Sequence, residues 1–142
     1  MSDDNIDELL HALNNESNES IMDLNRNQIK SLKNDMLQKL GIKGEELKKL
    51  HKKLKNYRYC TDMSDIQFGC YIRWIPLKNP ENIKLTNGGI IIDMDIINNC
   101  VQIKVKNNMN RIFQIKFDEC YIFQKITQQE QIILGVLDYL KK

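Results

Sequence analysis

The stretch from Gly89 to Ile126 decides the fold, and it reads GIIIDMDIINNCVQIKVKNNMNRIFQIKFDECYIFQKI. Apolar and polar residues alternate along it, which is typical of strands that bury one face. The pair Asn98-Asn99 and the run NNMN interrupt the alternation, and Asn tolerates the positive φ of tight hairpin turns. The stretch therefore predicts four antiparallel strands, at residues 89–97, 100–106, 111–117 and 120–126.

The same alternation predicts which side chains of the first three strands face the core. They are Ile90, Ile92, Met94, Ile96, Val101, Ile103, Val105, Phe113, Ile115 and Phe117. Asp93 and Asp95 mark the opposite face of the first strand, where paired carboxylates can bind Mg²⁺. An outward polar face beside a hairpin is a far commoner origin of such a pair, so no metal site is predicted.

Elements on either side of this stretch complete the predicted domain. GCYIRWIPL, residues 69–77, predicts a further strand that Pro76 restricts to an edge or an end. Gly88 and Gly89 predict a turn or bulge before the next strand. After the sheet, Thr127 and Glu130 form a capping box sequence that predicts a C-terminal helix. Its buried stripe is expected to be Ile132, Ile133, Val136, Leu137 and Leu140.

The N-terminal part of the chain predicts helices. Apolar residues within positions 20–40 follow helical spacing, and they are Ile21, Leu24, Ile29, Leu32, Met36 and Leu40. After Gly41, a second helix is expected to carry a heptad-like seam of Leu47, Leu50, Leu54 and Tyr57. Residues 21–58 are thus predicted to form a helical hairpin arm. Residues 1–20 are expected to be a mobile acidic tail, with either a short helix or a frayed segment.

The strand order resembles that of SH3-like small barrels, including the Tudor domains. The resemblance covers residues 67–126 and depends on GCYIRWI, LTNGGIIID and the NN and NNMN turns. It implies an α+β fold in which residues 67–142 form a five-stranded antiparallel SH3-like barrel with a C-terminal capping helix. Closure of the five strands would also protect the sheet edges.

The chain also resembles small uncharacterised proteins of large AT-rich DNA viruses of the mimivirus kind. FGCYIRWIPLKNPENIKLTNGGIIIDMDI and FDECYIFQKITQQEQIIL carry this resemblance. It implies a virus-encoded protein made in the host cytoplasm and packaged in the virion, and it implies no chemistry. The 20 Ile, 17 Lys and 16 Asn fit an AT-rich genome, although amoebae and parasites share that codon bias.

The net charge of +2 conceals a strong asymmetry. Residues 1–24 sum to −7, residues 25–58 to +8 and residues 59–142 to +1. The basic helix at 43–58 can neutralise phosphates, and the nucleic-acid-binding candidates are Lys48, Lys49, Lys52, Lys53, Lys55 and Arg58. The alternatives are a solvated helix in a Lys-rich protein and a partner for the acidic segment.

A protein interaction surface is the leading expectation. Its candidates are Tyr71, Arg73 and Trp74 on the barrel and Leu47, Leu50, Leu54 and Tyr57 on the arm. The loops at 78–88 and 107–110 lack aromatic residues, so a Tudor-type methyl-lysine cage is not expected. Arg73 can stack on a base, or it can form a cross-strand ion pair with Asp93 or Asp95.

Other features argue against catalysis, secretion and membrane insertion. The chain holds two histidines and none of the common catalytic or phosphate-loop motifs. Its start is acidic, and no apolar run approaches the ~18 residues of a membrane span. Its four cysteines lack a C-x-x-C pair, which favours free thiols over a zinc site.

We therefore predict a non-catalytic interaction or structural module. It is expected to be intracellular, in host cytoplasm or a virion, without a cofactor or a small-molecule substrate. A protein partner or a second copy is expected to dock on the barrel surface and the helical arm. The alternative is nonspecific binding of DNA or RNA through the basic helix.

Overall fold

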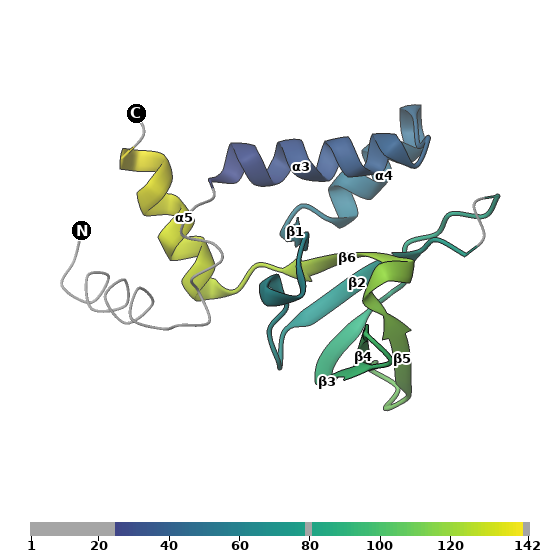
Figure 1. Cartoon of the computed structure of the whole chain (residues 1–142). Helices are drawn as coiled ribbons and strands as arrows, with labels where there is room; N and C mark the ends of the chain where they lie inside the picture. The colour runs from purple at the N-terminus through teal and green to yellow at the C-terminus, as the bar shows by residue number, and fades with distance from the viewer. Residues whose placement is uncertain (1–24, 79–80, 141–142) are drawn as a thin grey trace.

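The computed structural model describes residues 25–78 and 81–140, and these form an α+β fold (Figure 1). The helices are α3 (Arg26–Lys39), α4 (Gly44–Lys53) and α5 (Gln128–Leu140). The strands are β1 (Tyr57–Tyr59), β2 (Tyr71–Pro76), β3 (Gly89–Ile97), β4 (Cys100–Lys106), β5 (Ile112–Lys116) and β6 (Cys120–Lys125). Two short 3₁₀ helices are η2 (Met63–Asp65) and η3 (Phe117–Glu119). The predicted acidic tail at 1–20 lies outside the described residues.

The strands form one antiparallel sheet in the order β1-β6-β2-β3-β4-β5. The prediction of a closed five-stranded barrel is therefore wrong. Six strands are present, and the sheet is open, with β1 and β5 as its edges in the described part of the chain. The meander from β2 to β5 and the return of β6 beside β2 do follow the predicted chain order.

The unexpected strand is β1, which the sequence assigned to the end of the basic helix. Helix α4 ends at Lys53, and Leu54 is its C-cap. Tyr57, Arg58 and Tyr59 then pair with Lys125, Gln124 and Phe123 of β6. Aromatic residues favour a pleated, half-buried surface, and pairing with β6 prevails here over the helical spacing of the local sequence.

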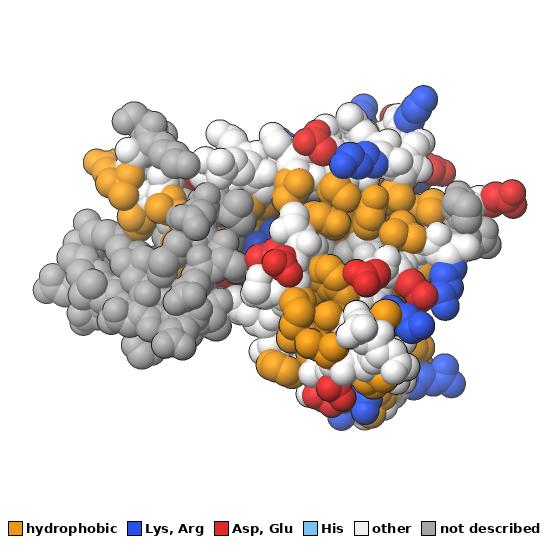
Figure 2. Space-filling view, in the orientation of Figure 1, with side chains coloured by type: hydrophobic (Ala, Val, Ile, Leu, Met, Phe, Trp, Pro, Cys, Tyr) orange, Lys and Arg blue, Asp and Glu red, His pale blue; other side chains and the backbone are white. Residues whose placement is uncertain are grey.

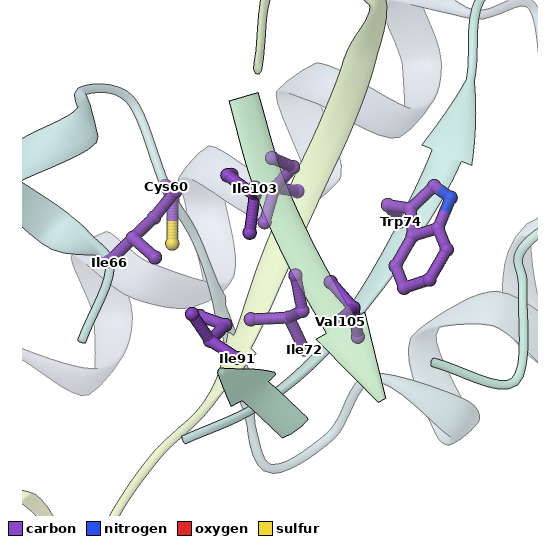
Figure 3. Close-up of a cluster of buried hydrophobic side chains, with 8 residues drawn as sticks. Cys60, Ile66, Ile72, Trp74, Ile91, Ile103 and Val105 are labelled. Atoms are coloured by element: carbon purple, nitrogen blue, oxygen red, sulfur yellow. The ribbon is translucent and has the colours of Figure 1, made fainter. Parts of the chain in front are cut away.

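One core fills the concave side of the sheet, where β3, β4 and β5 fold toward β2 and β6. Figure 3 shows its side chains converging from five separate segments: Cys60, Ile66, Ile72, Trp74, Ile91, Ile103 and Val105. Ile122 of β6 completes the cluster. The inward residues predicted for β4, Val101, Ile103 and Val105, are confirmed because all three belong to this core or pack against it.

A second core lies on the other side of β2 and β6, beneath α3 and α4 (Figure 1). Leu37 and Leu54 pack there against Ile75 and Phe123, and all four are fully buried. Alternate residues of β6 therefore serve different cores, which explains why Ile122 and Phe123 are both buried. Helices are present in both predicted helical segments, although α4 ends five residues before the predicted end at 58, and both pack against this side of the sheet.

A register shift in β3 corrects the predicted inward face. The shift falls between Ile91 and Asp93 in the pairing with β4, so the alternation of side chains changes there. Ile91 is buried, whereas Ile90 and Ile92 are exposed. The predicted tight hairpin is confirmed at Asn98 and Asn99, whose φ angles are 53° and 64°.

The capping box at the start of α5 is confirmed in both directions. The Thr127 N–H donates to Glu130 Oε1 at 2.9 Å, and the Glu130 N–H donates to Thr127 Oγ1 at 3.1 Å. The buried stripe differs in part from the prediction, because Leu134 is buried and Leu140 is exposed. Ile133 and Leu134 pack against Ile29, and this small cluster joins α5 to α3.

Candidate interaction surfaces

The three residues predicted to form a barrel interaction surface support the interior and a neighbouring loop. Trp74 is 6% exposed and belongs to the concave core. Arg73 Nε donates to the Thr86 carbonyl at 2.8 Å, and the Tyr71 hydroxyl donates to the Asn87 carbonyl at 2.6 Å. These bonds fix the segment that leads into β3.

The predicted seam of the helical arm also packs internally. Leu54 is fully buried, and Leu47, Leu50 and Tyr57 are half-buried against the core beneath the helices. Leu50 in addition lines a groove of about 680 Å³ between α4 and residues 81–85. The seam therefore attaches the arm to the sheet, and burial leaves little of it for a partner.

The lysines of the predicted nucleic-acid surface are exposed along α4 and just after it. They are Lys48, Lys49, Lys52, Lys53 and Lys55. Lys48 lies 3.9 Å from Glu45, and both side chains are largely exposed, so this pair is weak. Within the described residues, the other four lysines form no ion pair.

Arg58 does not belong to this surface. It lies in β1 and is 1% exposed, with its Nε 3.3 Å from a Glu130 carboxylate oxygen and its Nη2 donating to the Asp65 carbonyl at 2.9 Å. An arginine in a basic run is normally expected to be solvated. The alternation Tyr-Arg-Tyr was the available signal that this run had left the helix.

The open edge of the sheet is a surface that the sequence did not predict, because a closed barrel has no edges. Strand β5 pairs with β4 on one side, and no other described strand pairs with its free side. Two apolar side chains of β5 are exposed, Ile112 at 61% and Phe113 at 41%, and Met109 in the turn before it is 76% exposed. Figure 2 shows hydrophobic side chains at the surface of this half of the sheet, most of them over β3.

The remaining chemical candidates have structural roles. Asp93 and Asp95 each accept the N–H of the following residue, at 2.9 Å in both cases. Among the described residues, no three His, Cys, Asp or Glu side chains lie close enough to hold a metal ion. The four cysteines are free thiols, and burial raises the pKa of Cys60 to about 12.

No helix within residues 25–78 and 81–140 is long and apolar enough to cross a membrane. Comparison of the chain with protein-family models, with curated proteins and with solved structures finds no match.

Proposed function

We propose that this protein is a non-catalytic interaction module that pairs with a second copy of itself through the free edge of β5. The observation that carries the proposal is a largely apolar edge strand whose free side no described strand pairs with. Natural edge strands are usually shielded by charges, proline or bulges. Strand β5 reads IFQIK, with Lys116 as its one charged residue, and Ile112 and Phe113 are exposed beside a backbone that no described strand pairs with on its free side.

The backbone of β5 has its hydrogen-bonding groups directed outward. The Asn107 N–H donates to the Arg111 carbonyl at 2.9 Å, which makes 107 and 111 a hydrogen-bonded pair. Such pairs alternate along an antiparallel ladder. The N–H and carbonyl groups of Ile112, Gln114 and Lys116 therefore point away from β4, toward the free edge.

A second β5 fits this edge when the two strands run antiparallel about Gln114. Ile112 then lies opposite Lys116 of the other copy, and Gln114 lies opposite its own equivalent. Every outward N–H faces an outward carbonyl in this register. Lys116 of one copy and Lys116 of the other lie at opposite ends of the pairing, so these like charges do not meet. Phe113 packs against Ile115 of the other copy on the concave face.

Sedimentation of the full-length protein over a range of concentrations tests the proposal. We expect a dimer that dissociates on dilution. Ile112→Lys places like charges across the pairing and should weaken the dimer, whereas Ile112→Glu places opposite charges there and should preserve it. The two dissociation constants should differ by roughly tenfold, since each cross-strand charge pair contributes about 0.2–1 kcal/mol and occurs twice.

Two results would overturn the proposal. One is a wild-type protein that stays monomeric at several hundred micromolar. The other is equal weakening by Ile112→Lys and Ile112→Glu, since a pairing in another register or on another surface would not distinguish the sign of the charge. Ile112 is exposed, so both variants are expected to fold as the wild type does.

A second candidate function is nonspecific nucleic-acid binding, favoured by the exposed lysines that follow one another along α4. Counterion release would make such binding strongly salt-dependent. Lys49→Gln, Lys52→Gln and Lys53→Gln together should weaken binding of a DNA duplex at least tenfold at low salt. The matched control neutralises Lys104, Lys106 and Lys125, three exposed lysines of the sheet. Equal losses in both triple variants would contradict a site on α4.

A further inference from the structure

A cavity of about 420 Å³ lies between α3, the end of α4 and the start of α5. Its lining includes Arg26, Lys30, Lys33, His51 and Lys55, together with Asn56 and Gln131. No carboxylate is among the described residues that line it. It shares only Lys55 with the lysine set of α4, so it is a separate feature of the molecule.

Two of these cations are held in place by hydrogen bonds. Lys33 is 5% exposed, and its Nζ donates to the Leu54 carbonyl at 2.7 Å and to the Lys55 carbonyl at 3.4 Å. Lys33 therefore binds the carbonyl end of α4. Arg26 Nη2 donates to the backbone and side-chain oxygens of Gln131, both at 3.3 Å.

The positive charge of the cavity is only partly balanced by the residues that the structure describes. Asp138 of α5 lies 3.8 Å from Arg26 of α3, and both side chains are partly exposed. Lys30 and Lys55 form no ion pair within the described residues. Burial and then the charges of Lys33 and Lys30 lower the pKa of His51. Burial and then Lys30 lower the pKa of Lys33 in the same way.

We propose that this cavity binds a multiply charged anion of the phosphate class. Lys30 and Lys55, its exposed lysines that form no ion pair within the described residues, are the cations that contact the anion. Its volume lies within the range of about 300–1,000 Å³ found for small-ligand sites. The neutral donors Asn56 and Gln131 can add hydrogen bonds to oxyanions. The ligand is either a free polyphosphate or the phosphate group of a nucleotide.

Calorimetric titration of the full-length protein with inorganic pyrophosphate and with adenosine diphosphate tests the proposal. We expect binding of pyrophosphate that weakens at least tenfold in a Lys30→Gln, Lys55→Gln double variant. The control is Lys48→Gln with Lys52→Gln, which removes the same charge from α4 outside the cavity and should change the affinity less than twofold. Tighter binding of adenosine diphosphate would identify a nucleotide, and tighter binding of pyrophosphate a free polyphosphate.

The His51 ring provides a readout that does not depend on heats of binding. A bound anion should raise the pKa of His51, measured by NMR titration, and it should do so much less in the double variant of the cavity. Absence of both binding heat and a shift of the His51 pKa would overturn the proposal. Equal losses of affinity in the cavity variant and in the control would also overturn it, because they indicate attraction to net charge alone.

Discussion

The Nε atom of Arg58 lies 3.3 Å from a carboxylate oxygen of Glu130, and neither side chain is more than 2% exposed. The same guanidinium donates to the carbonyl of Asp65 at 2.9 Å. The other oxygen of Glu130 accepts the Thr127 N–H. Asp65 Oδ1 also lies 3.9 Å from Nη1 of Arg58. The buried guanidinium therefore joins the edge strand β1 to η2 and to the first turn of α5.

Glu130→Gln should destabilise the protein strongly. Glutamine can still accept the Thr127 N–H through its side-chain oxygen, so the capping box is preserved while the charge that faces Arg58 is lost. Removal of one partner of a buried pair typically costs about 3–5 kcal/mol. The loss should lie toward the lower end of that range, because the Asp65 carboxylate, 3.9 Å from Nη1 of Arg58, still balances part of the charge. Urea unfolding monitored by circular dichroism would measure the loss.

Two further variants isolate the ion pair. Thr127→Ala removes the cap alone and should cost about 1 kcal/mol. Arg58→Met combined with Glu130→Gln removes both charges and should be more stable than Glu130→Gln by itself. If Glu130→Gln lowers the free energy of unfolding no more than Thr127→Ala does, the charge of Glu130 does not stabilise the protein through Arg58.

Local patterns in the sequence predicted much of this fold. Strands β2 to β6, the Asn98-Asn99 turn and the Thr127 capping box each depend on short-range chemistry that a single stretch of sequence contains. The α+β class follows from the change in hydrophobic period after Tyr59. The structure agrees with the sequence wherever neighbouring residues suffice to decide the conformation.

Long-range contacts decided the elements that were predicted wrongly. Strand β1 exists because β6 pairs with it, and the charge of Arg58 is buried because Glu130 comes from α5. A register shift between Ile91 and Asp93 turned Ile91 inward in place of Ile90 and Ile92, whereas Met94 beyond the shift packs against the core as predicted. Whether the candidate interaction residues are free to bind a partner also depends on such contacts. The sequence around Trp74 or Leu54 would be the same whether that side chain faced a core or a partner.

Gly88→Ala should destabilise the protein far more than Gly41→Ala. Both glycines have positive φ, 84° at Gly88 and 77° at Gly41, so each substitution carries a conformational cost of about 1 kcal/mol. A Cβ at Gly88 would also overlap the carbonyl oxygen of Ile72, whereas a Cβ at Gly41 would meet no atom within 4 Å. Thermal unfolding of the two variants compares them directly.

The expected difference is about 1–3 kcal/mol, which is typical of forced overpacking. Equal melting temperatures for the two variants would show that β2 and the start of β3 separate easily enough to admit the methyl group. The close approach at Gly88 would then not constrain the entry into β3.

Cys60 should be the last of the four thiols to react with iodoacetamide in the folded protein. It is 2% exposed, and burial raises its pKa to about 12, so the reactive thiolate is scarce near pH 8. Mass spectrometry of partly alkylated protein would rank the sites. In urea all four should react at similar rates, and rapid labelling of Cys60 in the folded state would contradict its burial.

The stability of the protein should also depend on His51 below about pH 6.5. Burial and the neighbouring Lys33 and Lys30 lower the pKa of His51 in the folded state below its usual 6.5. Above pH 6.5 the ring is neutral in both states and contributes no pH dependence. As the pH falls through 6.5, the unfolded chain takes up a proton that the folded chain resists, so stability is lost until the lowered pKa is reached.

His51→Gln removes this titration and keeps a polar group beside Asn34, whose Oδ1 lies 3.0 Å from Nε2 of His51. Between about pH 7.5 and 5, the free energy of unfolding should therefore fall less in His51→Gln than in the wild type. Lys30→Gln removes one of the charges that lower the pKa of His51, so it should give an intermediate slope. Urea unfolding at a series of pH values would show this order, and parallel curves for the three proteins would mean that His51 has the same pKa in the folded and unfolded states.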